Sequence, residues 1–161
     1  MIRAALKRMA IDTGESGLFA IYENGHAVYV DKADSPQPVA TSVSIGSRSP
    51  AYATATGKAL LAYQPAAEIE RVIGQACACM PRTLTGRRVL LAELERVRER
   101  RLAYSVGEWH EEIAGAPAPV FGHSGEVVGA VGISCPRARV EERIEVLGAI
   151  VQSAAKELSD I

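Results

Sequence analysis

Four stretches of the chain carry apolar residues three or four positions apart, which is the spacing of one face of a helix. These stretches are residues 2–11, 65–73, 90–101 and 139–159. In the last of them the apolar residues form a single stripe, which predicts a helix that lies across a sheet. The third stretch carries charges of alternating sign on its other positions, so we interpret that side as a solvated helix face.

Other stretches are rich in β-branched and apolar residues and are bounded by turn residues. They predict six strands, at residues 17–22, 26–30, 39–45, 102–106, 114–121 and 127–134. Asn24-Gly25 lies between the first two strands and is a strong hairpin signal. The turn at residues 123–125 predicts a second hairpin. Within residues 39–45 larger side chains alternate with small ones, which is the two-residue period of a strand.

The order of the predicted elements is helix, three strands, helices, three strands and a final helix. Two hairpins favour an antiparallel sheet of five or six strands, and the helices have to cover its faces. We therefore predict an α+β fold. The length of 161 residues fits one domain with a substantial core.

Composition and charge exclude some functions. The net charge is −1, so the chain has no broad electrostatic attraction to nucleic acid or anionic lipid. The longest apolar runs are far shorter than a membrane span. Cys77, Cys79 and Cys135 form no disulfide framework, and this fits a reducing cytoplasm. Cys77 and Cys79 lack a second pair of ligands at zinc spacing, so we interpret them as packed thiols and expect neither a metal nor another cofactor.

Catalytic motifs are weak in this chain. Cys135 precedes a proline and is more typical of a small buried hydrophobic residue than of a nucleophile. No Gly-x-Ser-x-Gly elbow surrounds Ser134. The acidic loop at residues 107–112 is either a solvated loop or one in which a carboxylate points inward and restricts what enters a pocket. A small hydrolase or lyase that uses His110 or Glu108 stays open as an alternative, although we expect no catalytic residue.

Small residues gather where a ligand would need space. The last two predicted strands carry glycine and alanine at many positions, and Ala55-Thr56-Gly57 enters a helix with similarly small side chains. Glycine weakens a strand unless another group approaches closely, and the first amides of a helix are free to bind an anion. This pattern favours a cavity for a small organic acid. Dense packing of a helix on the sheet explains the same residues, and the alternative for Gly57-Lys58 is a tight helix entry followed by a surface lysine.

Three blocks of sequence together resemble the effector-binding domain of the IclR family of bacterial transcriptional regulators. The most specific block is Gly46-x-x-x-Pro50-x-Tyr52-Ala53-Thr54-Ala55-x-Gly57-Lys58-Ala59-Leu60-Leu61-Ala62. The others are residues 94–105, and the segment Ala118-Pro119-Val120-Phe121 followed by a turn, Val127-Val128-Gly129-Ala130-Val131-Gly132-Ile133-Ser134 and Pro136. The resemblance covers nearly the whole chain.

The resemblance implies a GAF-like domain, in which helices flank an antiparallel sheet and a pocket takes a small organic effector. It implies that residues 1–13 are a linker helix and residues 14–161 the effector-binding domain. In the family a winged helix-turn-helix domain precedes the linker and binds DNA, and we expect that domain to be absent from this chain. The expected partners are an organic-acid effector, further copies of the chain in a dimer or tetramer, and operator DNA only through the N-terminal domain, with no membrane.

The pocket positions of the family transfer to eight residues by motif. These are Thr41 on the third strand, Ala55, Thr56 and Gly57 at the helix entry, Glu108 in the acidic loop, Gly115 on one strand, and Gly132 and Ser134 on the next. The amides of Ala55 and Thr56 would hold the carboxylate of the effector. Glycine stands at 115 and 132, where the resemblance leads us to expect cysteine and serine. Fewer polar contacts favour a larger or more apolar acid, such as an aromatic one, over glyoxylate or pyruvate.

The sequence thus predicts a ligand-sensing, oligomerising and non-enzymatic domain of a transcriptional regulator. Two alternatives stay open beside it. A GAF-like signalling or oligomerisation domain with a vestigial pocket predicts self-association without a ligand, whereas the small hydrolase or lyase predicts turnover of a bound acid.

Overall fold

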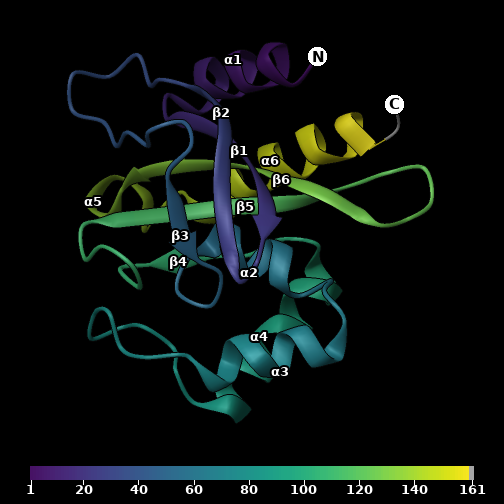
Figure 1. Cartoon of the computed structure of the whole chain (residues 1–161). Helices are drawn as coiled ribbons and strands as arrows, with labels where there is room; N and C mark the ends of the chain where they lie inside the picture. Colours follow the sequence, from purple (N-terminus) through teal and green to yellow (C-terminus); the bar gives the residue numbers. More distant parts are fainter. Residues whose placement is uncertain (160–161) are drawn as a thin grey trace.

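The computed structural model describes residues 1–159, which form a six-stranded antiparallel sheet with helices on both faces (Figure 1). The strands are β1 (Ser16–Glu23), β2 (His26–Ala33), β3 (Arg48–Pro50), β4 (Ser105–Val106), β5 (Ile113–Phe121) and β6 (Val127–Pro136). The helices are α1 (Ile2–Thr13), α2 (Ala55–Leu61), α3 (Ala66–Gly74), α4 (Arg87–Arg100), α5 (Arg137–Val140) and α6 (Ile144–Ser159). The predicted α+β class and the antiparallel sheet of five or six strands are confirmed. Residues 160 and 161, at the end of the expected domain, lie outside the described residues.

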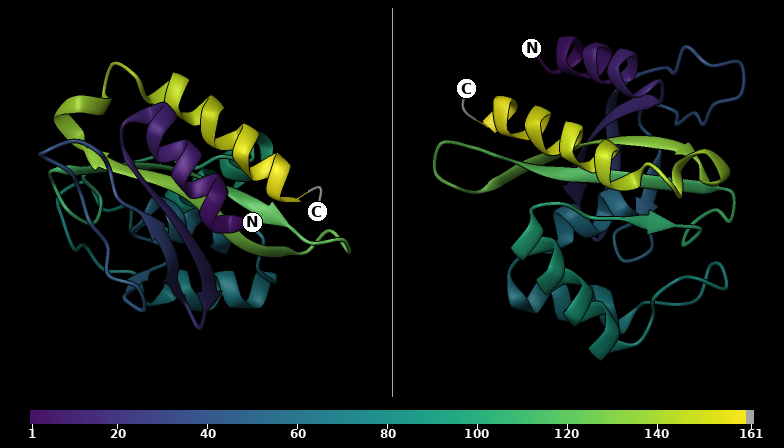
Figure 2. Two further views of the ribbon diagram at one scale, coloured as in Figure 1. Left: turned by 90° about the horizontal axis from the view of Figure 1, so that it is seen from above. Right: turned by 180° about the vertical axis from the view of Figure 1, so that it is seen from behind.

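The sheet separates two layers of helices. Its strand order is β3-β2-β1-β6-β5-β4. α1 and α6 lie beside each other on one face, and α2, α3 and α4 lie on the other (Figure 2). Each layer encloses a core of its own because successive side chains of a strand point to opposite faces. On β1, for example, Leu18 and Ala20 pack in the core with α2, whereas Phe19 packs in the core with α6. Among residues 1–159, no helix combines the length and apolar character that crossing a bilayer requires.

Both predicted hairpins form. β1 and β2 pair on either side of Asn24 and Gly25, whose φ angles of 45° and 82° are left-handed values that these two residue types tolerate. β5 pairs with β6, and the register places Gly115 opposite Ser134. β1 pairs with the other edge of β6 and places Ser16 opposite Ser134. Ser134 therefore lies on a central strand of the sheet.

The predicted strand at residues 39–45 is wrong. None of these residues belongs to a strand, and Val39 and Ile45 are 71% and 56% exposed. The edge of the sheet beside β2 is formed instead by β3, which pairs with it antiparallel. Residues 39–45 therefore find no free strand edge to pair with, and the segment forms a loop.

Side chains from the sheet and from α5 hold this loop in place. Ser16 Oγ donates to the carbonyl oxygen of Thr41 at 2.7 Å, and Arg139 Nη1 donates to the carbonyl oxygen of Val39 at 2.7 Å. The guanidinium of Arg139 also forms two hydrogen bonds with Glu15, both at 2.7 Å. Glu15 is buried, so this ion pair anchors α5 on the domain.

The predicted final helix at residues 139–159 is divided in two. α5 ends at Val140 and α6 begins at Ile144. Both parts keep an apolar side toward the sheet, and Val140, Leu147 and Val151 are buried in the same core. The periodic pattern therefore identified the buried face correctly but did not reveal the break. The predicted helices at 2–11, 65–73 and 90–101 correspond to α1, α3 and α4.

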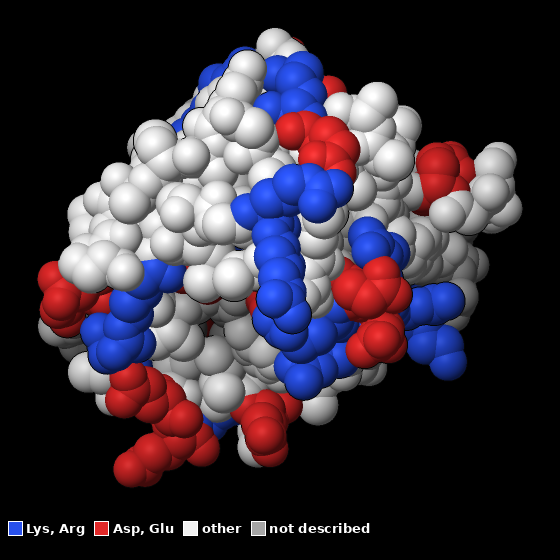
Figure 3. Space-filling model, turned by 90° about the horizontal axis from the view of Figure 1, so that it is seen from below, with Lys and Arg blue, Asp and Glu red and all other residues white. Residues whose placement is uncertain are grey.

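The outer face of α3 and α4 carries charges of both signs side by side (Figure 3). Four arginine–glutamate pairs lie on these two helices: Arg71–Glu68, Arg87–Glu70, Arg96–Glu93 and Arg98–Glu95. The interpretation of α4 as a helix with a solvated, charged face is confirmed. A face of mixed sign offers no broad attraction to nucleic acid.

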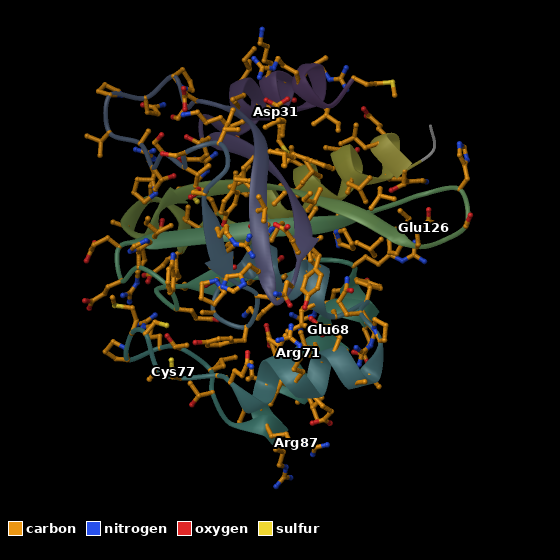
Figure 4. All side chains as sticks on the ribbon, viewed as in Figure 1. Asp31, Glu68, Arg71, Cys77, Arg87 and Glu126 are labelled. Carbon is orange, nitrogen blue, oxygen red and sulfur yellow. The ribbon has the colours of Figure 1, made fainter. Side chains whose placement is uncertain are left out.

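Glu68 on this face lies beside Arg71 (Figure 4). It accepts hydrogen bonds from Arg71 Nε at 2.9 Å and from the hydroxyl of Tyr22 on the first hairpin. The hydrogen bonds from Arg71, followed by the one from Tyr22, lower the pKa of Glu68 to about 2.

We expect Glu68→Gln to lower the free energy of unfolding at neutral pH. The folded-state pKa lies below the ordinary value, so the stabilisation is present above pH 4.5 and is lost as the pH falls toward 2. Urea unfolding from about pH 7 to about pH 3 should show the two proteins converging as the pH falls. Glu95→Gln is the control, because an exposed pair such as Glu95–Arg98 contributes about 0–1 kcal/mol. A constant gap between the Glu68 variant and the original chain at all pH values would contradict this assignment.

Candidate functional site

A cavity of about 340 Å³ lies between α2, the centre of the sheet and two loops. Its walls come from all six strands, from residues 42–44 and 47, from residues 54–56 and from residues 109–110. A cavity of this size lies at the lower end of the range for small-molecule sites. It therefore suits a ligand with one ring or a short chain rather than a nucleotide.

Part of the cavity lining is apolar. Leu18, Ile113 and Trp109 contribute to it, whereas the side chain of Ile133 packs in the core with α6. Trp109 lies edge-on to His110, with 5.6 Å between the ring centroids. An aromatic and aliphatic wall of this kind favours a ligand with an apolar body.

The lining also includes a chain of buried hydroxyl groups. The hydroxyls of Tyr29 and Ser49 lie 3.2 Å apart, and Ser49 Oγ lies 3.3 Å from Thr54 Oγ1. Thr54 caps α2, because its Oγ1 accepts the backbone N–H of Gly57 at 3.0 Å. The hydroxyl chain thus connects the cavity wall to the start of α2. The eight predicted positions did not include Tyr29 or Ser49, although Ser49 lies inside the block that resembles the family.

The backbone amides of Ala55 and Thr56 are available to a ligand. Both residues line the cavity, and neither N–H donates to an acceptor within the part of the chain that the structure describes. The first N–H groups of any helix lack partners inside the helix. Two free donors beside polar hydroxyls can donate hydrogen bonds to a carboxylate.

Gly57 does not face the cavity, although it is adjacent to these amides. A Cβ atom at this position would lie 2.3 Å from Cα and 2.6 Å from the carbonyl oxygen of Ala51. The glycine therefore lets the backbone of α2 approach the preceding segment. Its role in the site is to position Ala55 and Thr56.

Ser134 and Gly115 lie opposite each other on the cavity wall. Ser134 Oγ accepts a hydrogen bond from Thr41 Oγ1 at 2.9 Å. Thr41 is not among the lining residues, so it reaches the site only through Ser134. Gly132 does not line the cavity either, and a Cβ there would lie 2.7 Å from Cα of Pro117 on β5. The neighbouring strand thus explains the glycine at 132 by packing.

The alternative interpretation of Lys58 as a surface lysine is wrong. Its side chain is fully buried, and Nζ donates to Glu108 Oε1 at 2.9 Å, to the carbonyl oxygen of Tyr104 at 2.9 Å and to Glu93 Oε1 at 3.3 Å. Three acceptors satisfy all three hydrogens of the ammonium group. The backbone oxygen of Glu108 accepts a further hydrogen bond from the hydroxyl of Thr83. Lys58 therefore fixes the acidic loop to α2 and α4.

Glu108 takes part in this buried ion pair and is not among the residues that line the cavity. Burial raises the pKa of its carboxyl above the ordinary value, and the charge of Lys58 opposes that shift. Its Oε2 atom is buried without a hydrogen-bond partner among the described residues. One carboxylate of the loop does point inward, but toward Lys58. Glu108 influences the cavity by holding the neighbouring Trp109 and His110.

Groups for catalysis or metal binding are poorly placed. His110 lines the cavity, but Glu108 is held away from it by Lys58. Cys135 is buried on the opposite face of the sheet, and its Sγ donates to the carbonyl oxygen of Ala114 at 3.4 Å. Burial, followed by the charge of Glu15, raises the pKa of the Cys135 thiol to about 12. Within residues 1–159, no cluster of three or more His, Cys, Asp and Glu side chains could hold a metal ion.

The structure brings together half of the predicted site residues at the cavity itself. Ala55, Thr56, Gly115 and Ser134 line it, whereas Thr41, Gly57, Glu108 and Gly132 do not. Three of the four residues outside the lining still act on it: Thr41 donates to Ser134, Gly57 positions the start of α2, and Glu108 holds the acidic loop. The polar residues that line the cavity outside the eight predicted positions include Tyr29, Arg48, Ser49, Thr54, Ser105 and His110.

Comparison with known proteins supports the same class of domain. The family model of the bacterial transcriptional regulator IclR C-terminal domain matches residues 1–160. The chain is 30% identical to the HTH-type transcriptional regulator KdgR of Escherichia coli K12, over 99% of this chain and 63% of KdgR. The crystal structure of the C-terminal domain of E. coli KdgR superposes with a TM-score of 0.84 at 29% identity, over 98% of this chain and 93% of that one.

The fold is also shared with a solved IclR homologue from Microbacterium hydrocarbonoxydans, crystallised with 4-hydroxybenzoate. It superposes with a TM-score of 0.90 at 19% identity, over 99% of this chain and 65% of that one.

The sheet, its two helical layers and the cavity beside α2 define a GAF-like domain of a transcriptional regulator. The chain belongs to the IclR family and corresponds to its C-terminal domain. It spans less than two thirds of the length of KdgR.

Proposed function

We propose that the domain senses a small organic acid and that the acid binds in the cavity beside α2. The observation that carries this proposal is the cavity itself, whose lining combines the free amides of Ala55 and Thr56 with apolar side chains that include Trp109. A carboxylate can accept the two amides while an apolar or aromatic body occupies the wall. The buried hydroxyls of Tyr29 and Ser49 suit a polar substituent on that body.

We propose that binding shifts the population of conformations of a longer regulator. Residues 1–13 would act as its linker helix, and a winged helix-turn-helix domain would contact operator DNA. A ligand can shift such an equilibrium only by the difference in its affinity for the two states. We also propose that the domain self-associates as a dimer or tetramer in the cytoplasm. The relatives support the regulatory role because they are named as transcriptional regulators.

Ser134→Ala is expected to weaken binding of the acid without unfolding the domain. The variant removes a hydroxyl from the cavity wall and leaves Thr41 without its acceptor. One hydrogen bond contributes about 0.5–1.5 kcal/mol, which corresponds to a loss of affinity of about two- to tenfold. Isothermal titration measures the affinity, and thermal unfolding of the free protein controls for stability. Unchanged affinity would remove Ser134 from the site.

The fate of the ligand separates the sensor from the enzyme. We propose that the domain is not an enzyme, so an acid that binds should be recovered unchanged after incubation. 4-Hydroxybenzoate is a suitable first aromatic probe because a protein of the same fold was crystallised with it. Chromatography of the recovered ligand detects turnover. A product that forms in proportion to protein concentration would favour the hydrolase or lyase, and self-association with no ligand bound would favour the vestigial pocket.

A further inference from the structure

Cys77 and Cys79 lie on the segment between α3 and α4, and neither lines the cavity. Cys77 is labelled in Figure 4. The hydroxyl of Tyr52 lies 3.4 Å from Cys77 Sγ and 3.7 Å from Cys79 Sγ. Cys77 is exposed and Cys79 is half-buried, so the interpretation of Cys77 as a packed thiol is wrong and reagents in solution can reach the pair. Both thiols therefore gather at one oxygen atom and remain accessible.

Tyr52 also fixes the backbone that carries the two thiols. Its hydroxyl donates to the carbonyl oxygen of Cys77 at 3.0 Å and accepts the N–H of the same residue at 3.2 Å. The ring of Tyr52 is buried in the core with α2. An otherwise irregular segment is thereby anchored at the position of the thiols.

The two cysteines cannot form a closed metal site of the structural zinc type. Such a site needs four ligands, and within residues 1–159 no third His, Cys, Asp or Glu joins the pair. Two accessible thiols without further metal ligands are suited to a reaction between the two sulfur atoms themselves. Closure to a disulfide is the simplest reaction of that kind.

We propose that Cys77 and Cys79 are a modifiable dithiol site, positioned by Tyr52, that closes to an internal disulfide on reaction with a small disulfide such as oxidised glutathione. The thiolate of Cys77 attacks one sulfur of glutathione disulfide and forms a mixed disulfide, and one glutathione leaves as its thiolate. The thiolate of Cys79 then attacks the Cys77 sulfur, and the second glutathione leaves. The two protein thiols lose two protons and two electrons, and glutathione disulfide gains the two electrons. Cys77 reacts first because it is the more exposed of the two.

Mass spectrometry of the full chain after incubation with glutathione disulfide tests the proposal. We expect a product lighter by two hydrogen atoms, with residues 77–79 cross-linked and resistant to alkylation until a reductant is added. Cys135 is the internal control, because a fully buried thiol should stay reduced throughout. Stable glutathione adducts on both Cys77 and Cys79 without a cross-link, or no reaction at either residue, would overturn the proposal.

Two variants test the order of the steps and the role of Tyr52. Cys79→Ser should stop at the mixed disulfide on Cys77, whereas Cys77→Ser should react several times more slowly. Tyr52→Phe should slow ring closure several-fold relative to the first step, so that the mixed disulfide accumulates transiently. A general loosening of the segment in Tyr52→Phe would speed mixed-disulfide formation and ring closure together. If the ratio of these two rates is the same in Tyr52→Phe as in the original chain, Tyr52 does not position the thiols.

Discussion

Lys58→Met is expected to lower the free energy of unfolding by about 3–5 kcal/mol at pH 7, because it removes one partner of a buried ion pair. Glu108 would keep a buried carboxylate with no ammonium beside it, and one of its oxygens already lacks a partner among the described residues. A loss of this size is a large share of the stability of an ordinary domain. Urea unfolding monitored by Trp109 fluorescence gives the value.

The cost of Lys58→Met should shrink at acid pH. Burial raises the pKa of Glu108, so its contribution to stability is greatest below the ordinary pKa and falls as the pH rises through the folded value. Removing the ammonium raises that pKa further, and the carboxyl is then neutral over a wider acid range. Comparison of the two proteins at each pH isolates this effect.

Two further variants control the Lys58 experiment. Glu108→Gln combined with Lys58→Met should recover part of the stability, because it removes the uncompensated charge. Lys156→Met, at an exposed position on α6, should change stability by less than about 0.5 kcal/mol. If Lys58→Met costs no more than Lys156→Met, the lysine is not buried in the ion pair described here.

Gly57→Ala is expected to cost about 1–3 kcal/mol and to abolish most of the affinity for the acid. The added methyl group would overlap the backbone of Ala51, which cannot move aside as a flexible side chain could. The start of α2 must then shift, and the amides of Ala55 and Thr56 shift with it. Thermal unfolding and isothermal titration measure the two effects.

Gly74→Ala is the matched control for Gly57→Ala. Gly74 also lies in a helix, and a Cβ there would meet no atom within 4 Å among the described residues. Alanine is favoured over glycine in a helix by about 0.5–1 kcal/mol, so this variant should be slightly stabilising and should bind normally. Equal effects at the two positions would show that Gly57→Ala changes only helix propensity and that close packing at Gly57 is not required.

Structural features that depend on residues close together in the sequence were predictable. The hairpin at Asn24-Gly25 follows from two adjacent residues that tolerate left-handed angles, and the buried faces of α1 and α6 follow from spacing alone. The prediction of a strand at 39–45 was wrong because alternation of large and small side chains does not reveal whether a neighbouring strand has a free edge. β3 occupies that edge, and no local signal reports it.

The site was predictable to the extent that a contiguous motif encodes it. Ala55 and Thr56 were identified because they enter a helix within one block of sequence. The burial of Lys58 was not, because lysine is rarely buried and its partners Glu93 and Glu108 lie 35 and 50 residues away. Tyr29 joins the cavity only through the pairing of β2 with β1 and β3, which brings it beside Ser49.

Thermal unfolding in the presence of matched carboxylates and carboxamides tests the central claim most directly. The panel would contain oxo acids and aromatic acids, each paired with its neutral amide. An acid at one hundred times its dissociation constant adds about 2.7 kcal/mol, which shifts the midpoint of a domain of this size by about 5–10 °C. The cavity beside Ala55 and Thr56 predicts that at least one acid gives such a shift and that its amide does not. Flat curves for every acid, or equal shifts for an acid and its amide, would contradict an anion-binding sensor.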